Sequence, residues 1–524
     1  MRFLTDKVLF FLICFCILID VICCFGSHWG RTVAHSEWGS CPEHCRCMPL
    51  NHRGVRELLD SLDSIPELGS KAEIESRNDG RTMICQGIRR LPNPVPYDIV
   101  TLTILGDSSI GIFNPPSSPN HQSDHHSLIT NTQLRHIDRD SFRSSSRLNE
   151  VTLSGNNIGV LYPYSFHHLR RLRHLSLQNN NIRHLSAAVF RGLDHIEELT
   201  LSDNIIQYLP QAVFNSLPNL VSLSLNGNKI RRLHSNQFKS LIHLRRLNLS
   251  RNNITGFSND MFDRNTKLEE LQLNGNRIWS IEARWFRNLV SLRILSLRGN
   301  AITSISPNTF ETLVNLEELL LSANHIDELQ AGTFNNLRKL KILDVATNDI
   351  QEIQSDSFTD LHVLEELYLA TNNLNYLQNR TFDKIPKVSR LDLSRNKIEL
   401  IEEGTLDPLT SIQYLDLSHN KIRQIRKGLF GSLGELKELN LDHNFISDIA
   451  KSAFSTSNGK PSKLVFLSLQ HNDIRQLEAE SLSGIPKLKS INLGHNKLRR
   501  THSMAFSACE NLQVLDLTHN KLKI

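Results

Sequence analysis

The sequence predicts an α/β solenoid with a parallel sheet on its inner, concave side, and three observations lead to this fold class. An asparagine recurs every 24 residues, a phenylalanine recurs at the same interval, and leucines alternate with other residues just before each asparagine. A fixed period in the twenties is the signature of a chain that stacks one small unit on the next. We therefore expect short strands on the concave side and irregular or short helical segments on the convex side.

The repeating units occupy residues 127–524, and we count about 17 of them, the last incomplete. A typical copy is IQYLDLSHNKI at residues 412–422, which follows L-x-x-L-x-L-x-x-N-x-I/L with isoleucine in place of the first leucine. The asparagine occurs sixteen times, at Asn156, Asn180, Asn204, Asn228, Asn252, Asn276, Asn300, Asn324, Asn348, Asn372, Asn396, Asn420, Asn444, Asn472, Asn496 and Asn520. One interval is 28 residues because residues 455–463 contain an insertion of four, which we expect to form a convex loop.

The alternating leucines predict the strand of each unit, because successive side chains of a strand point to opposite faces. In Leu367-Tyr368-Leu369 the two leucines point into the core and Tyr368 points out. At a strand spacing of about 4.8 Å, sixteen strands make a sheet on the order of 75 Å long. A surface of this length suits a protein partner better than a small ligand.

The recurring asparagines and phenylalanines are predicted to be structural. A buried asparagine amide offers both donors and an acceptor to the backbone of the turn that follows each strand. The phenylalanines form a buried row behind the sheet, and each is worth about 1.5–3 kcal/mol when fully buried. They stand at Phe142, Phe166, Phe190, Phe214, Phe238, Phe262, Phe286, Phe310, Phe334, Phe358, Phe382, Phe430, Phe454 and Phe506, with leucine at Leu406 and Leu482.

Four segments precede the repeats: a signal peptide at 1–26, a polar lead at 27–40, a cysteine-rich cap with an insertion at 41–104, and a Ser/Pro/His-rich loop at 105–126. The signal peptide is predicted from the basic Arg2 and Lys7 and the apolar run that follows them. An uncleaved membrane anchor is the alternative, which Asp20 and the shortness of the run disfavour. After signal removal, no stretch of the sequence predicts a membrane span. The chain stops at Ile524 directly after a strand, so we expect it to be a fragment of a longer protein.

Four cysteines stand together ahead of the repeats: Cys41, Cys45, Cys47 and Cys85. A secreted chain favours disulfides between them, and a zinc site is the alternative. Disulfides would let a short segment cover the open apolar end of the solenoid. Cys509 replaces a leucine of other repeats and is therefore predicted to be a buried small residue rather than a nucleophile.

The motif C-P-x-x-C-x-C at Cys41 to Cys47, the later Cys85, and units such as LSLQNNNIRHL and LNLDHNFISDI resemble the extracellular leucine-rich repeat family. The resemblance implies a horseshoe fold and protein binding through the concave face. It also implies pairing of Cys41 with Cys47 and of Cys45 with Cys85. The unbroken array and the sequence around Cys509 are similar to transmembrane leucine-rich repeat and immunoglobulin-domain proteins, while chaoptin-like, Slit-like and Toll-like receptor proteins remain alternatives.

Candidate binding residues stand at outward strand positions of the predicted sheet. They are the apolar Ile294, Leu320, Ile342, Tyr368 and Tyr414 and the charged Glu318, Glu366 and Arg246. Exposed aromatic and aliphatic side chains commonly anchor protein partners. Scattered surface hydrophobics are equally normal, so both interpretations stand.

Charge is segregated along the repeats although the whole chain has a net charge of only +5, which indicates no nucleic-acid partner. Residues 135–251 hold 14 Arg and 2 Lys against 7 acidic residues, and residues 310–406 hold 17 acidic against 9 basic residues. The basic end, including Arg173, Arg245 and Arg246, makes heparan sulfate or an acidic protein a candidate partner.

Three N-glycosylation motifs begin at Asn248, Asn253 and Asn379. Asn248 occupies an outward strand position, so a glycan there would obstruct the concave face at that repeat.

Five histidines directly precede the recurring asparagine of five consecutive repeats: His419, His443, His471, His495 and His519. A pH-sensitive or metal-binding ladder is one interpretation, and an ordinary variant of the repeat is the other.

No enzyme motif or cofactor fingerprint occurs, so catalysis is not expected. The sequence predicts a recognition module, secreted or on the extracellular face of the cell, that binds a protein ligand or co-receptor through its concave face. A cell-adhesion or matrix protein, which would include glycosaminoglycan binding, and an innate immune receptor ectodomain are the alternatives.

Overall fold

The computed structural model describes residues 135–143, 146–455 and 461–522, together with the backbone of four strands that precede them. The chain divides into two compact units, Met1–Glu43 and His44–Ile524. The predicted signal peptide, the polar lead and Cys41 lie outside the described residues, as do residues 50–80 of the cap insertion and residues 106–126 of the predicted loop.

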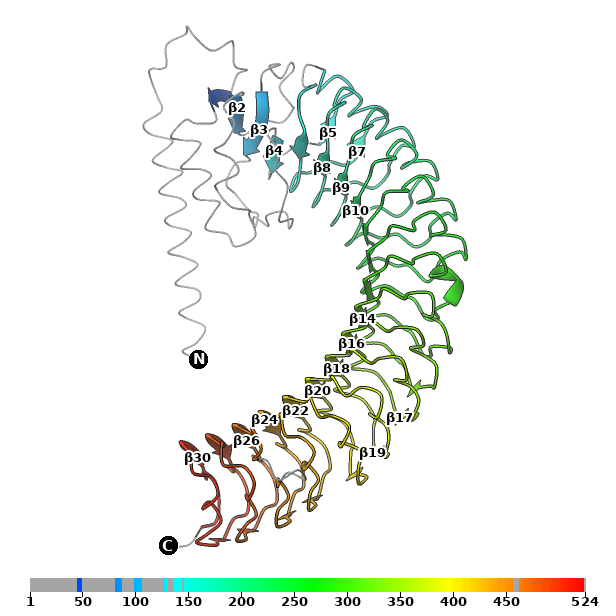
Figure 1. Ribbon diagram of the computed structural model, residues 1–524. Helices are drawn as coiled ribbons and strands as arrows, with labels where there is room; N and C mark the ends of the chain where they lie inside the picture. Colours follow the sequence, from blue (N-terminus) through cyan, green and yellow to red (C-terminus); the bar gives the residue numbers. More distant parts are fainter. Residues whose placement is uncertain are drawn as a thin grey trace, which may run out of the picture. The chain divides into compact units, whose positions relative to one another are not determined.

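One sheet of twenty strands runs through the second unit. It begins with β1 (Cys45–Pro49), antiparallel to β2 (Arg81–Gln86), and continues in parallel through β3 (Ile99–Leu105) and β4 (Ser127–Thr130). Each repeat then adds one three-residue strand, and these strands follow one another along the inner side of the array in Figure 1. They are β6 (Glu150–Thr152), β8 (His174–Ser176), β9 (Glu198–Thr200), β10 (Ser222–Ser224), β11 (Arg246–Asn248), β12 (Glu270–Gln272), β13 (Ile294–Ser296), β14 (Glu318–Leu320), β16 (Ile342–Asp344), β18 (Glu366–Tyr368), β20 (Arg390–Asp392), β22 (Tyr414–Asp416), β24 (Glu438–Asn440), β26 (Phe466–Ser468), β28 (Ser490–Asn492) and β30 (Val514–Asp516).

The register of the sheet follows from the leucine at the centre of each strand. Leu367 of β18 is aligned with Leu343 of β16 and Leu391 of β20, and all three are buried. The residues before and after each central leucine point to the other face. A slip of one residue would expose every leucine, so the burial pattern specifies this parallel register.

The asparagines form the predicted ladder between neighbouring repeats. The side-chain amide of Asn180 donates to the carbonyl oxygens of Leu153 (2.8 Å), Leu177 (3.1 Å) and Gln178 (3.1 Å). Its Oδ1 accepts the backbone N–H of Ile158 at 3.0 Å. Because the same arrangement recurs at successive repeats, a buried polar side chain satisfies backbone groups of its own turn and of the preceding repeat.

The phenylalanines pack in the predicted row behind the sheet. Phe142 and the ten that follow it to Phe382 are fully buried, and rings of neighbouring repeats lie near 6 Å apart, as between Phe190 and Phe214 (6.4 Å). Leu406 and Leu482 continue the row as buried residues. The row and the central leucines together form one elongated core.

Of the two expectations for the convex side, irregular segments are confirmed and short helices are not. Among the described residues that side consists of single turns and one three-residue 3-10 helix, Ala283–Trp285. Each outer segment closes with bonds such as that from Leu361 N–H to the Phe358 carbonyl (3.1 Å), and the next core residue ends the turn before a helix can extend. The fold is therefore a parallel-sheet solenoid with almost no helix, rather than an α/β solenoid.

Pairs of two-residue strands form small parallel sheets beside the long one. They are β5 (His136–Ile137) with β7 (Val160–Leu161), β15 (Glu328–Leu329) with β17 (Glu352–Ile353), β19 (Tyr376–Leu377) with β21 (Leu400–Ile401), β23 (Gln424–Ile425) with β25 (Asp448–Ile449), and β27 (Gln476–Leu477) with β29 (Arg500–Thr501). They link successive repeats at the point where the chain turns away from the concave face.

Candidate functional site

The predicted binding residues all lie at the first or third position of a concave strand, with a buried leucine between these positions. Ile294, Glu318, Ile342, Glu366, Tyr414 and Arg246 are first residues, and Leu320 and Tyr368 are third residues. Arg246 is exposed and the others are partly exposed. The sheet therefore presents them on one face, and their role in binding remains a prediction.

The parallel register places apolar and acidic side chains alternately in two rows. In the first row Ile294, Glu318, Ile342 and Glu366 are neighbours on successive strands. In the second row the neighbours are Leu320, Asp344, Tyr368, Asp392 and Asp416. We define the acidic-apolar patch as Glu318, Leu320, Ile342, Glu366, Tyr368, Asp392, Tyr414 and Asp416. Sequence reasoning missed the aspartates of the second row, although Asp392 and Asp416 are 24 residues apart and Asp344 is 48 residues before Asp392.

Hydrogen bonding and stacking orient the two tyrosines of the patch. The Tyr368 hydroxyl donates to Glu366, and burial together with this carboxylate raises the pKa of Tyr368 to about 12. The guanidinium of Arg390 lies 4.4 Å from the centre of the Tyr414 ring, a cation-π contact. Both aromatic rings are thus held against the sheet, which lowers the entropy that a partner must remove on binding.

Ion pairs balance the charge at the border of the patch. Glu317 pairs with Arg293 (2.7 Å) and Lys341 (3.0 Å). Hydrogen bonds from Arg293 and Lys341 lower the pKa of Glu317 to about 2. Arg298 reaches across two repeats to Asp344 at 2.7 Å. These pairs are partly exposed, so each contributes little to stability, but they leave these two carboxylates less able to attract a partner.

The arginines proposed for heparan sulfate are paired as well. Arg173 bonds to Glu197 and Arg245 to Glu269, each on the next repeat. Arg246 spans two repeats to reach Glu198 at 2.9 Å. These three arginines are therefore locally balanced, whereas the exposed Arg170 and Arg171 have no ion pair among the described residues.

The three glycosylation motifs lie at different places. Asn248 is the third residue of β11, and its Oδ1 accepts the backbone N–H of Ser250 at 3.0 Å. Asn253 follows a ladder asparagine and is partly exposed. Asn379 is exposed in the turn after β19, where its N–H donates to Glu402 at 2.7 Å. Only Asn248 lies on the concave face, three strands before the patch begins at β14.

Two of the cap cysteines are aligned across the first strand pair. Cys45 of β1 is opposite Cys85 of β2, and Cys47 is opposite Met83. Directly opposite residues of antiparallel strands have Cα atoms about 4.5–5.5 Å apart, within the range that a disulfide spans. Cys509 is buried as predicted, and burial raises the pKa of its thiol, which disfavours the reactive thiolate.

The five histidines form a stacked column beside the concave face. Each has a left-handed backbone, with φ between 52° and 54°, at the position directly before a ladder asparagine. Centres of neighbouring rings lie 4.1–4.3 Å apart and their planes differ by 8–19°. Nearly parallel rings direct their nitrogen lone pairs side by side rather than toward one point. The part of the chain that the structure describes contains no cluster of three or more residues suited to hold a metal.

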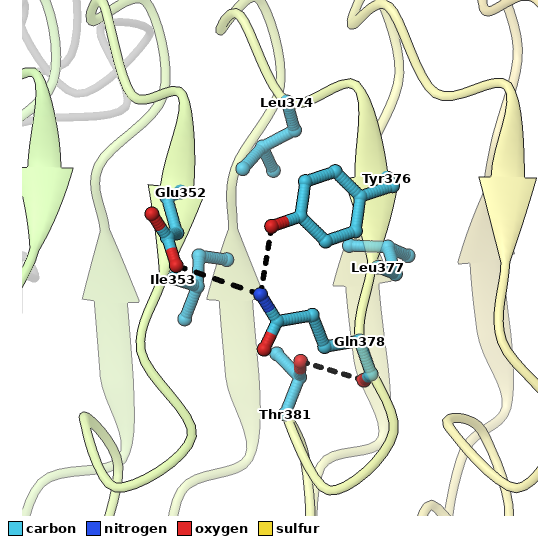
Figure 2. Close-up of a pocket in the computed structure, with 7 residues that line it drawn as sticks. All are labelled: Glu352, Ile353, Leu374, Tyr376, Leu377, Gln378 and Thr381. Atoms are coloured by element: carbon cyan, nitrogen blue, oxygen red, sulfur yellow. Dashed lines mark hydrogen bonds between the residues drawn. The ribbon is translucent and has the colours of Figure 1, made fainter.

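A small hollow between repeats lies away from the concave sheet, beside β17 and β19 (Figure 2). Its volume is about 10 Å³, roughly that of one water-sized sphere. Gln378 crosses it, since its amide donates to the Tyr376 hydroxyl (2.8 Å) and to Glu352 (3.5 Å). This hollow is too small and too fully bonded to serve as a ligand site.

The repeats match the family model for the leucine rich repeat over residues 128–458 and 462–522, in eight overlapping or adjoining segments. These segments cover most of the chain, and it therefore belongs to the leucine-rich repeat family. Comparison with curated protein sequences gives no significant match. In the residues described, no helix is both long and apolar enough to cross a membrane.

Several solved structures share the fold at low sequence identity. A leucine-rich repeat protein of Leptospira interrogans is 23% identical with a TM-score of 0.61, covering 82% of this chain and 93% of its own. Toll, in the Drosophila Toll–Spatzle complex, is 18% identical with a TM-score of 0.62, covering 85% and 64%. The plant peptide hormone receptor RGFR1, in complex with RGF2, is 21% identical with a TM-score of 0.54, covering 75% and 67%. These likenesses concern the fold.

Proposed function

We propose that this chain is a non-catalytic, extracellular recognition module that binds a protein ligand or co-receptor through the acidic-apolar patch of its concave sheet. The observation that carries the proposal is that apolar and carboxylate side chains are interspersed in the two rows from β14 to β22, with Arg390 as the one cation among them. Apolar anchors surrounded by polar groups are typical of binding hot spots. Toll and RGFR1, whose fold is similar, are described in complexes with Spatzle and RGF2, which agrees with such a role.

Several sequence features support an extracellular location. The predicted signal peptide at residues 1–26 would direct the chain to secretion, and the three glycosylation motifs would be modified there. The alignment of Cys45 with Cys85 suits a disulfide, which persists in oxidising compartments. We expect non-reducing peptide mapping of the secreted protein to link Cys45 to Cys85 and Cys41 to Cys47, and recovery of both pairs as free thiols would contradict this.

The test of binding is a screen of the secreted protein against a panel of purified extracellular ectodomains, followed by paired variants. Tyr368→Ala removes an anchor of the patch, and Trp279→Ala removes an exposed aromatic outside it, with 64% of its surface accessible. We expect Tyr368→Ala to weaken binding by about 2 kcal/mol, roughly 30-fold, as hot spots do. Trp279→Ala is expected to bind normally. The reverse result would place the interface outside the concave face.

A further inference from the structure

The carboxylates of the acidic-apolar patch outnumber the cations of the same rows. From β14 to β24 the two rows carry one cation, Arg390, which lies between Glu366 and Tyr414 and stacks on the Tyr414 ring. Glu318, Glu366, Asp392 and Asp416, with Glu438 on the next strand, have no salt-bridge partner within 4.0 Å among the described residues. Their hydrogen bonds come from neutral groups: Tyr368 donates to Glu366, backbone N–H groups of Ser394 and Ser418 donate to the two aspartates, and the Asn440 amide also donates to Asp416. Arg293, which pairs with Glu317, also interacts electrostatically with Glu318. This differs from the repeats around Arg173 and Arg246, where Glu198 of the first row and Glu197 directly before it are paired.

This excess of carboxylates over cations determines the charge of a fitting partner. Complementary charges raise the rate of association and exclude like-charged partners. The apolar Leu320, Ile342 and Tyr368 lie between the carboxylates in the same two rows. A fitting segment therefore carries lysine or arginine side chains interspersed with apolar ones.

The histidine column stands beside the C-terminal part of this surface. His419 follows β22, which carries Asp416, and His443 follows β24, which carries Glu438. The charged and titratable groups that act on the column are Arg395 in the preceding repeat, Asp442 and Asp516 on the concave side, and the neighbouring histidines themselves. Lys421 and Lys497 follow ladder asparagines directly and pair with Glu399 and Asp473.

Stacking controls how this column takes up protons. Rings 4.2 Å apart cannot all be charged, because adjacent imidazolium ions repel each other at contact distance. The pKa of His443 is lowered by burial and by His419, and that of His495 by burial and its two neighbours His519 and His471. His443 and His495 are therefore held neutral at neutral pH and gain charge in acid, and protonation of one ring disfavours protonation of its stacked neighbours.

We propose that the concave face from β14 to β24 binds a basic, apolar-containing protein segment at neutral pH, and that protonation of the histidine column releases this segment in mild acid. The inference rests on the proposed function and specifies its partner and its regulation. Imidazole is the side chain whose unperturbed charge change falls between about pH 5 and 8, so the histidines are the groups of this surface that change charge in mild acid.

The test uses two fluorescein-labelled peptides and the secreted chain, with affinity measured by fluorescence anisotropy. One peptide alternates lysine with leucine or tyrosine, and its comparator has glutamate in place of each lysine. We expect the lysine peptide to bind at about pH 7.4 and to bind about tenfold more weakly at about pH 5.5. The glutamate peptide is expected not to bind at neutral pH.

Two sets of variants separate the carboxylates from the histidines. Glu366→Gln, Asp392→Asn and Asp416→Asn together should abolish lysine-peptide binding, whereas Glu311→Gln, Asp383→Asn and Glu403→Gln remove three exposed carboxylates outside the patch and should not. His419→Asn, His443→Asn and His471→Asn should keep binding at neutral pH and remove its acid sensitivity. Asparagine suits these left-handed positions, since Asn179 occupies the equivalent one with φ 53°.

Each opposing result has a definite meaning. The inference is overturned if the two peptides bind with equal affinity. It is also overturned if the histidine variants lose lysine-peptide affinity in acid as the unmodified protein does. If Tyr368→Ala disrupts an ectodomain complex while the lysine peptide fails to bind, the proposed function stands and the assigned partner chemistry is wrong. If the outer carboxylate variants lose peptide binding as the patch variants do, the surface is wrongly placed.

Discussion

The asparagine ladder offers the sharpest test of how the solenoid is held together, and Asn372→Ala is the variant to examine. Its side-chain amide donates to the carbonyls of Val345 (3.0 Å), Leu369 (3.0 Å) and Ala370 (3.3 Å), and its Oδ1 accepts the N–H of Ile350 at 3.0 Å. Truncation leaves those buried backbone groups without this partner. At about 1–3 kcal/mol for each buried group left unsatisfied, and with relaxation recovering part of the loss, we expect a destabilisation of about 3–5 kcal/mol.

The adjacent Asn373 provides a matched control, because it is partly exposed and its single amide bond, to the Asp349 carbonyl, is 3.5 Å long. Asn373→Ala should change stability by less than about 0.5 kcal/mol. The stability of both variants is measured by urea unfolding, monitored by circular dichroism. The urea midpoints are compared directly, because a long repeat array need not unfold in one step. Equal midpoints for the two variants would refute the ladder as a main source of stability.

Three further outcomes follow from the structure. Phe358→Ala should cost about 3–5 kcal/mol in urea unfolding, because the fully buried ring stacks between two others; a cost below about 1 kcal/mol would contradict the core. The pKa values of His443 and His495 are lowered in the folded state, so the unfolded state binds more protons in acid. Stability should therefore fall as pH drops below about 6.5. We expect a lower Tm in acid, and His443→Asn should partly restore it. For glycosaminoglycan binding, Arg170 and Arg171 are the better candidates, because both are exposed and form no ion pair among the described residues. Replacing both with alanine should lower heparin affinity more than Arg246→Ala does, since Glu198 already balances the charge of Arg246.

Much of the architecture was predictable because each recurring residue has one physical role. Leu367, at the centre of the strand Glu366–Tyr368, and its equivalents specify strand faces and register, and the ladder asparagine specifies the turn that follows. The convex side was mispredicted as partly helical, because apolar residues such as Phe358 and Leu361, three apart, suit one helical turn as well as a single 3-10 turn. The length of a turn depends on packing against the next repeat, which local sequence does not report.

The candidate surface was predictable in position but not in charge balance. Counting arginines suggested a basic concave end, yet Arg246 reaches two repeats away to Glu198, a contact that no nearest-neighbour argument finds. The histidine column was visible in the sequence, whereas its face-to-face stacking depends on a left-handed backbone. That backbone also occurs at Ala323, where the residue type gives no sign of it.

The central claim is that the concave patch is the binding surface, and a glycan placed on it tests this most directly. Leu320→Asn completes a glycosylation motif with Ser322 on β14, and Val290→Thr completes one at Asn288 on the convex side. Mass spectrometry would establish that each site is occupied, and affinity for an ectodomain partner would then be compared. We predict a loss of at least about 100-fold for Leu320→Asn and none for Val290→Thr, because a bulky glycan blocks docking only where the partner lies. Full affinity of the glycosylated Leu320→Asn protein would contradict the account.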